Sequence, residues 1–267
     1  MTKVYIQPYG VSDSAKHFAA ALRNADVVCQ RLRYQNSNYS GHADDLIINW
    51  GSSQYRKYHD VLGLEILNEP KAVKRAVNKG LCFNALQEAG VPIPRFTYNY
   101  LQALDWIHQD GIVLAARTDT TSHSGKGIVI SAHGDYLPRA PLYTQFTKSK
   151  GEYRVHIFNG EMIDYAKKRR RTDAPPIGIE KSIRSYNNGW IYTRKNADGE
   201  AIPIPDAFVD AAKAGVQALG LDFGAVDILN VGGEPVILEI NTAPGLAGET
   251  TINSYVNAVK KHLETKQ

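Results

Sequence analysis

Two carboxylates and an amide near the end of the sequence have oxygen atoms that could bind a metal ion together. Asp227 precedes an apolar run and the turn Gly232-Gly233, and the strand-like segment 236–241 carries Glu239 and Asn241. Because residues two apart in a strand project to one face, Glu239 and Asn241 point together. Oxygen ligands suit a hard cation such as Mg²⁺, which shares its remaining positions with water and substrate phosphates. The pattern predicts a nucleotide-phosphate site, and a solvated hairpin face is the alternative.

The loop of this hairpin decides whether Asp227 joins the other two ligands. Asp227 reaches the face of Glu239 only if the loop has an odd number of residues, for example the three residues 232–234 with a glycine at positive φ. We therefore expect a loop of this kind, with exposed ligands whose replacement leaves the fold largely intact.

The residues after Asn241 extend the pattern. The segment Thr242-Ala243-Pro244-Gly245 ends the strand with a Pro-Gly turn and brings backbone amides close to the carboxylates. The run from Asp227 to Gly245 resembles the metal-binding signature of the ATP-grasp superfamily, in particular the branch of ribosomal-protein glutamate ligases, glutathione synthetases and D-alanine ligases. The resemblance implies that ATP is bound and that Asp227, Glu239 and Asn241 hold Mg²⁺, with Mn²⁺ as an alternative metal.

A second segment, 142–158, resembles the part of ATP-grasp enzymes that holds the nucleotide. The resemblance implies that backbone groups of Gln145, Phe146 and Thr147 contact the adenine edge. It also places Glu152 where an acceptor-only side chain binds the ribose hydroxyls, and it adds Arg154 to the nucleotide site. The family usually has an acidic residue at the position of Gln145, but an amide oxygen can still accept from the adenine amino group.

A basic run follows the predicted turn Asn159-Gly160. Five consecutive cations, residues 167–171, would by composition indicate a solvated or nucleic-acid-binding patch. Their position resembles that of the basic pair that ATP-grasp enzymes direct at the transferring phosphoryl group, which implies this catalytic role for Lys167 and Lys168. The remaining arginines, 169–171, are interpreted as contacts for an acidic substrate, with a solvated loop as the alternative.

One more arginine follows the basic run. The segment 182–189 resembles the arginine and asparagine segment of the ribosomal-protein glutamate ligases and implies that Arg184 acts at the reaction centre. Its guanidinium fork fits a phosphate or a carboxylate bidentately.

Three cations lie earlier in the chain. Two helices are predicted over 71–77 and 80–89, since Pro70 suits a first helical turn and Gly90 a helix end. Their segment resembles the family's first phosphate-binding segment and implies that Lys79 is a phosphate ligand. A buried strand over 111–117 leads to a loop of glycines and hydroxyls, which resembles the family's phosphate-covering loop. Arg117 stands where the family has lysine, and Lys126 in the loop could share its role.

The first 68 residues have a different character. Strands are predicted over 3–7, 27–32 and 46–49, and a capped helix over 12–24. This alternation favours a small parallel sheet. We therefore expect an α/β protein with an N-terminal α/β domain (1–68), a helical segment with the small ATP-grasp subdomain (69–146), and a large ATP-grasp subdomain with the metal site (147–267).

Composition is consistent with a soluble enzyme. The chain has 267 residues, 43% of them hydrophobic, and a formal charge of +4, which slightly favours anionic substrates and does not require nucleic acid. Cys29 and Cys82 lack metal-ligand spacing and indicate a reducing compartment. No apolar stretch approaches about 20 residues and no signal peptide is expected, so we predict no membrane association and a cytoplasmic location.

The sequence therefore predicts an ATP-dependent ligase. As the resemblance implies, ATP would phosphorylate a small-molecule or peptide carboxylate, and an amine would attack the acyl phosphate to form an amide. A small-molecule kinase with the same nucleotide site, or a nucleotide-binding module without turnover, are the alternatives, because a fold does not settle a function.

Overall fold

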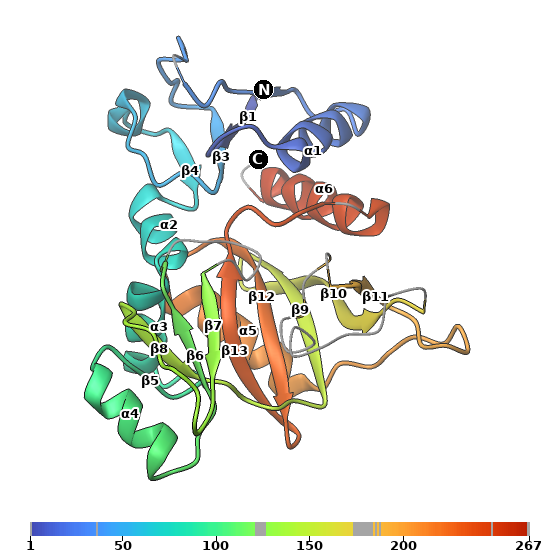
Figure 1. Ribbon diagram of the computed structural model, residues 1–267. Helices are drawn as coiled ribbons and strands as arrows, with labels where there is room; N and C mark the ends of the chain where they lie inside the picture. Colours follow the sequence, from blue (N-terminus) through green and yellow to red (C-terminus); the bar gives the residue numbers. More distant parts are fainter. Residues whose placement is uncertain are drawn as a thin grey trace.

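The computed structural model describes residues 2–35, 37–120, 127–172, 184, 186, 188–246 and 248–265. Their strands form three sheets, with a parallel sheet in the N-terminal part and two antiparallel sheets below it (Figure 1). Among the described residues, no helix is long and apolar enough to cross a membrane. Lys126 and most of its loop lie outside the described residues.

The N-terminal sheet is parallel, as predicted, with the strand order β2-β1-β3-β4. Its elements are β1 Val4–Pro8, α1 Asp13–Asn24, β2 Cys29–Arg31, β3 Leu46–Trp50, the short 3₁₀ helix η1 Lys57–Asp60, and β4 Glu65–Leu67. Helix α1 begins where the Ser12 side chain accepts a hydrogen bond from the Ala15 amide at 3.2 Å. Its apolar residues recur at helical spacing and are buried against the sheet.

The last helix of the chain completes this N-terminal core. Helix α6, Glu249–Glu264, packs beside α1, although the two helices lie near opposite ends of the sequence (Figure 1). Tyr255 and Val259 are fully buried there, in one cluster with Phe18 and Trp50. The N-terminal core is therefore built from both ends of the sequence, and the domain boundaries given above stay a prediction.

The small antiparallel sheet has the order β5-β8-β6-β7. Its elements are β5 Phe96–Thr97, α4 Tyr100–His108, β6 Leu114–Arg117, β7 Ile128–Ser131 and β8 Leu142–Gln145. The two preceding helices, α2 Pro70–Val77 and α3 Lys79–Glu88, begin and end close to their predicted bounds. Both helices pack into the core of the central sheet, and Phe83 of α3 also stacks on Phe96 of β5 in the small sheet.

The central sheet has the order β11-β10-β9-β12-β13 and is antiparallel throughout. Its strands are β9 Gly151–Phe158, β10 Glu161–Arg170, β11 Trp190–Thr193, β12 Phe223–Val231 and β13 Glu234–Asn241. Helix α5, Asp206–Ala218, covers one face. It approaches closely at Gly215, where a Cβ atom would lie 2.8 Å from Ile237 Cδ1. That face therefore carries the core, and the other face is left for a site.

The hairpin of β12 and β13 differs from the predicted one. Its loop has two residues, because Val231 pairs with Glu234, and this even number would by itself put Asp227 and Glu239 on opposite faces. A register shift next to Asp227 restores the alignment: Ile228 pairs with Ile237, but Asp227 pairs with Glu239. The expectation of an odd loop was therefore wrong, and a β-bulge supplies the extra residue.

Asn68 joins the N-terminal sheet to the central sheet. It is fully buried and has a positive φ of 63°. Its side-chain oxygen accepts from the amides of Asp222 and Phe223 at 2.8 and 3.1 Å, and its side-chain nitrogen donates to the Phe223 carbonyl at 2.9 Å. On the other side, Asn49 donates to the Asn68 carbonyl at 2.7 Å. One residue thus fixes the start of β12 against the ends of β3 and β4.

We expect Asn68→Ala to destabilise the protein by about 3–5 kcal/mol, because three buried hydrogen bonds are lost and alanine is strained at positive φ. Asn159→Ala is the matched control. Asn159 also has positive φ, 47°, but lies in an exposed hairpin turn, so only about 1 kcal/mol should be lost. Urea unfolding followed by circular dichroism measures both values. Equal losses in the two variants would show that Asn68 is not the joint.

Candidate active site

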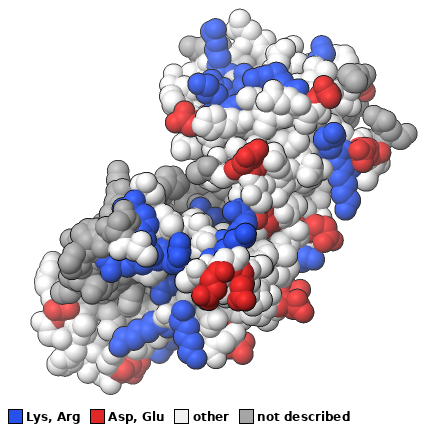
Figure 2. Space-filling model, turned by 90° about the vertical axis from the view of Figure 1, so that its right-hand side faces the viewer, with Lys and Arg blue, Asp and Glu red and all other residues white. Residues whose placement is uncertain are grey.

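The face of the central sheet opposite α5 carries charged side chains in register. On β9, the residues Glu152, Arg154 and His156 alternate with core residues and line a cavity of about 1070 Å³. Strand alternation explains the pattern, because residues two apart share a face. Lys and Arg side chains also gather around a hollow on this side of the molecule (Figure 2).

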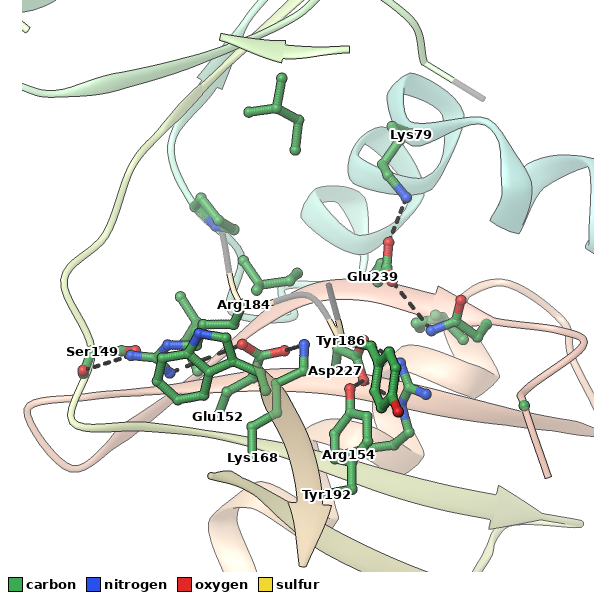
Figure 3. A pocket seen from close by; sticks show the side chains of 18 of the residues that line it. Lys79, Ser149, Glu152, Arg154, Lys168, Arg184, Tyr186, Tyr192, Asp227 and Glu239 are labelled. Atoms are coloured by element: carbon green, nitrogen blue, oxygen red, sulfur yellow. Dashed lines mark hydrogen bonds and ion pairs between the residues drawn. The ribbon is translucent and has the colours of Figure 1, made fainter. Parts of the chain in front are cut away.

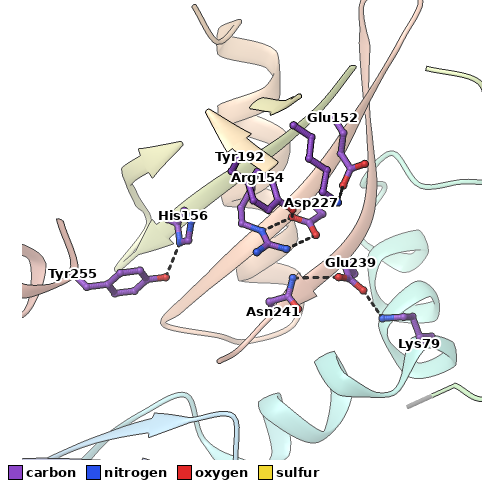
Figure 4. A network of polar contacts seen from close by, with 10 residues as sticks. Lys79, Glu152, Arg154, His156, Tyr192, Asp227, Glu239, Asn241 and Tyr255 are labelled. Carbon is purple, nitrogen blue, oxygen red and sulfur yellow. Dashed lines mark hydrogen bonds and ion pairs between the residues drawn. The ribbon is translucent and has the colours of Figure 1, made fainter. Parts of the chain in front are cut away.

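The three predicted metal ligands meet in this cavity, and each carboxylate already contacts a cation (Figure 4). Arg154 donates two hydrogen bonds to Asp227, both of 2.7 Å. Lys79 donates to Glu239 at 2.8 Å, and the Asn241 amide donates to the same carboxylate at 3.3 Å. Burial alone would raise the pKa of Glu239, but the Lys79 ammonium holds it well below its usual range.

The expected exposure of these ligands was wrong for Asp227, which is only 3% exposed. Burial opposes the charge on Arg154, yet Asp227 raises the pKa of this guanidinium above its ordinary value. Removing one partner of such a buried pair leaves the other charge uncompensated. Replacement of Asp227 would therefore disturb the fold as well as the site.

The oxygen donors fit a hard cation. Among the described residues, no group of three or more His, Cys, Asp or Glu side chains is placed to hold a metal. The available set is instead two carboxylates and an amide on adjacent strands, Asp227, Glu239 and Asn241. A set with so few charged ligands suits Mg²⁺, which completes its shell with water and substrate phosphates.

A second charge cluster surrounds Glu152 (Figure 3). This carboxylate is 3% exposed, lies 2.5 Å from the Lys168 ammonium, and lies 3.9 Å from Arg184 Nη1. Arg184 also donates to the Ser149 carbonyl at 3.1 Å. Burial raises the pKa of Glu152, and the Lys168 ammonium opposes the increase. The predicted ribose ligand and two predicted catalytic cations are therefore neighbours.

The structure does not bring Lys167 to this cavity. Neighbouring strand residues face opposite ways, so only Lys168 of the predicted pair lines the cavity. The Lys167 ammonium lies 5.4 Å from the Tyr153 ring on the other face, and its side chain crosses Gly151, where a Cβ atom would lie 2.9 Å from Lys167 Cε. Residues 169 and 170 belong to strand β10, not to a loop.

The predicted adenine segment lines the cavity at the end of β8. The amides of Gln145 and Phe146 already donate to the carbonyls of Arg95 and Val113, at 2.7 and 2.8 Å. Of the three residues, only Thr147 has an amide without a hydrogen bond to another described residue. An adenine edge in this place would therefore meet the Thr147 amide and nearby carbonyls.

Arg117 lines the cavity at the end of β6. Among the described residues its Nε atom has no hydrogen-bond partner, although the atom is buried. Burial lowers the pKa of Arg117, and Glu239 opposes the decrease. Buried donors are rarely left unpaired in folded proteins, so this guanidinium is placed to receive an anion.

Several cavity residues were missed by the sequence analysis, and they share strand β11 or its end. The Tyr192 hydroxyl donates to Asp227 at 3.3 Å, and its ring lies 4.4 Å from the Arg154 guanidinium. Trp190 lies 5.1 Å from the guanidinium of Arg184. The alternation of large side chains at 190, 192 and 194 was the available signal, because it places all three on one face.

His156 is a further titratable group of this face that no prediction included. It is buried and its Nδ1 atom lies 3.1 Å from the hydroxyl of Tyr255 in α6 (Figure 4). Burial, and then the charge of Arg154, lower the pKa of His156 to about 3. The side chain is therefore neutral at physiological pH. Its contact with Tyr255 links α6 to the sheet without a charge.

Comparison with known proteins gives distant relatives and a shared fold. No family model matches the sequence. A protein of Legionella pneumophila (strain Corby) named probable alpha-L-glutamate ligase is 23% identical over 255 residues, covering 88% of this chain and 81% of the relative. The ATP-grasp ligase PsnB, solved with a minimal precursor, Mg and ADP, has a TM-score of 0.68 at 14% identity, with 97% and 96% coverage. D-alanine–D-alanine ligase from Bacillus anthracis gives 0.60 at 15% identity, with 99% of both chains covered.

The depressed pKa of His156 predicts sensitivity to acid. Between the pKa of an unfolded histidine, about 6.5, and the folded value, unfolding takes up a proton, so stability falls as the pH falls. Within this window, protonation of His156 should lower the free energy of unfolding by about 1.4 kcal/mol for each pH unit of acidification. Urea unfolding at pH 7, 6 and 5 should give a smaller decrease for His156→Gln than for the wild type or for Tyr255→Phe. Equal slopes would contradict the assignment.

Proposed function

We propose that this chain, a member of the ATP-grasp superfamily, is an ATP-dependent ligase that joins a carboxylate to an amine through an acyl phosphate. The observation that carries the proposal is a single cavity lined by Thr147 and by the paired carboxylates Asp227 and Glu239, together with Lys79 and Arg117. Such a cavity offers a contact for the adenine edge, cations that can bind phosphates, and oxygen ligands for a metal in one place.

Each part of the cavity has a task in this proposal. Glu152 accepts hydrogen bonds from the ribose, and Arg117 and Lys79 bind the phosphates. Mg²⁺, held by Asp227, Glu239 and Asn241, supplies neutralisation of phosphate charge when it is bound. Lys79 now contacts Glu239. Its ammonium therefore turns from the carboxylate to a phosphate when nucleotide enters.

The proposed reaction has two steps. A carboxylate oxygen of the substrate attacks the γ-phosphorus of ATP, the bond to the bridging oxygen breaks, and ADP leaves. The amine nitrogen then attacks the acyl carbon, a proton leaves the nitrogen, and inorganic phosphate departs. Arg184 and Lys168 lie at the cavity wall, where their charges can stabilise the oxygens of the transferring group. The protein mainly holds and neutralises the reactants.

The charge around the cavity supports an acidic carboxylate substrate, small molecule or peptide. Arg170, two residues beyond Lys168 in β10, lies on the same face of the strand as Lys168, and the partly exposed Arg171 follows it. We also propose that the protein is cytoplasmic and that the individual residues have the roles given above. Transfer of the phosphoryl group to a hydroxyl would make the chain a kinase instead.

Hydroxylamine separates the ligase from the kinase. In place of the natural amine it should trap the acyl phosphate as a hydroxamate, with ADP and phosphate released in equal amounts. Arg184→Ala should lower hydroxamate formation about 10²–10³-fold, as for loss of one transition-state donor, with a smaller change in ATP binding measured by calorimetry. A stable phosphorylated product without hydroxamate, for every carboxylate tested, would replace the ligase proposal with the kinase.

A second variant tests the metal ligand. Glu239→Gln keeps the size of the side chain and removes one negative charge, so Mg²⁺-dependent ATP turnover should fall by at least about 10²-fold, as for the loss of other charge-stabilising groups. Glu234→Gln on the same strand is the matched control, because Glu234 is exposed, and its turnover should stay unchanged. If the Glu239→Gln variant turned over ATP at the wild-type rate, at the same Mg²⁺ concentration as the wild type, Glu239 would not be a metal ligand.

A further inference from the structure

We infer that a groove on the outer side of helices α2 and α3 is a docking site for an acidic, amphipathic segment of a partner protein. The groove has a volume of about 730 Å³ and shares no lining residue with the catalytic cavity. Its walls come from α2, from α3 with the residue that follows it, and from the last residue of α5. The docking site goes beyond the proposed function and does not depend on it, because binding takes place at a different surface.

Three cations of α2 form a basic wall of the groove. Lys71, Lys74 and Arg75 are three or four residues apart, so they lie on one face of the helix. Within the described part of the chain, none of the three forms an ion pair, and Glu88 is the one carboxylate among the described lining residues. Arg75 Nη1 donates to the Leu219 carbonyl at the end of α5 at 3.3 Å, which holds this wall against α5. The groove therefore has an excess of positive charge that no described side chain compensates.

The α3 side of the groove is apolar and exposed. Leu81 and Ala85 are four residues apart and share one face of the helix, and Ala89 follows one turn later. Leu81 is 46% exposed, although other residues of the same helix are buried in the core. Tyr98 extends this apolar side, since its hydroxyl donates to Asn84 of the groove at 2.8 Å and the residue is 49% exposed. Two large apolar side chains therefore face solvent next to the basic wall.

The size and the chemistry of the groove select its occupant. A water molecule takes about 30 Å³ of liquid, so an inorganic anion of a few atoms would leave most of the 730 Å³ empty. A nucleic acid could pair its phosphates with the cations but would gain little from the exposed Leu81. A protein segment with carboxylates on one side and apolar side chains on the other complements both walls, as amphipathic helices do in other grooves. Charge complementarity and the exposed apolar side chains therefore favour the same partner.

The groove and the catalytic cavity use different parts of one helix pair. Helices α2 and α3 follow one another beside the central sheet (Figure 1). Val77 at the end of α2 and Lys79 at the start of α3 line the cavity, and Lys79 donates to Glu239 at 2.8 Å. The basic wall lies earlier on the same α2. A segment docked in the groove therefore contacts the helix pair that carries Lys79, without contact to the catalytic side chains.

The test measures the binding of labelled probes to the whole chain by fluorescence anisotropy. The main probe is a synthetic amphipathic peptide of Leu-Glu-Glu repeats. Poly-L-glutamate and a Leu-Gln-Gln repeat peptide of equal length each keep one of its two features, and a single-stranded DNA oligonucleotide represents nucleic acid. We expect the wild type to bind the Leu-Glu-Glu peptide at least about 10-fold more tightly than any of the other three probes, because only this peptide gains both the ion pairs and the apolar contacts.

Two variants each remove one feature of the groove. Lys71→Gln/Lys74→Gln should weaken binding of the Leu-Glu-Glu peptide about 5- to 10-fold, as for two exposed ion pairs, and Leu81→Ser about 5-fold, as for a partly buried apolar contact. All three positions are exposed, so the fold should persist, which circular dichroism checks.

The matched controls remove the same groups elsewhere. Lys260→Gln/Lys261→Gln removes two exposed cations from α6, and Leu62→Ser removes a leucine that is 94% exposed in the N-terminal part. Both controls should bind the Leu-Glu-Glu peptide like the wild type, because neither changes the groove.

Binding that needs both features of the peptide, and that both groove variants but neither control weaken, supports the docking site. Absence of binding, or groove variants that bind like the wild type, overturns it. Equally tight binding of poly-L-glutamate would show a general cationic surface, and tighter binding of the oligonucleotide would make nucleic acid the ligand; either result overturns the proposal. Sedimentation velocity without peptide tests a second copy of the chain as the occupant. A dimer that the groove variants lose would assign the groove to self-association instead.

Discussion

A single extra residue in strand β13 is the constraint on which the site depends. Ile237 and Ile240 both pack into the core although they are three residues apart, and this is possible only because the bulge between them changes the face. The same shift sets Glu239 opposite Asp227. Without it, one of the two carboxylates would lie under α5, in the core. The same bulge is therefore required for the packing of the core and for the position of the oxygen ligands.

Charge balance organises the rest of the cavity. Four carboxylates in or beside the cavity each have a cation, in the pairs Asp227–Arg154, Glu239–Lys79, Glu152–Lys168 and Asp164–Arg194. Buried pairs of this kind contribute little net stability, since desolvation offsets their attraction, but they fix geometry. Arg117 and Arg184 have no such exclusive partner among the described residues. These two positive charges suit a ligand that brings negative charge with it, as a nucleotide does.

The cavity has two different ends because two parts of the chain close it. The small sheet supplies the Thr147 end, and the N-terminal part supplies the other end through Gly51 and the start of α6. Asn68 and the contact of His156 with Tyr255 hold the N-terminal part and α6 against the central sheet. The geometry of this end therefore depends on His156, which lines the cavity, and on Asn68, which does not. A substitution at Asn68 would change the cavity through the position of the N-terminal part.

The sequence by itself determined the local elements and the composition of the site. Helices α2 and α3 follow from Pro70 and Gly90, the parallel N-terminal sheet follows from the alternation of strand and helix, and Glu239 with Asn241 follows from a period of two. These signals are local, so a short window contains them. The tertiary structure alone decided the bulge, the departure of Lys167 from the cavity and the place of Arg194. Each depends on which strand pairs with which and in what register, and register is set by contacts between residues far apart in the chain.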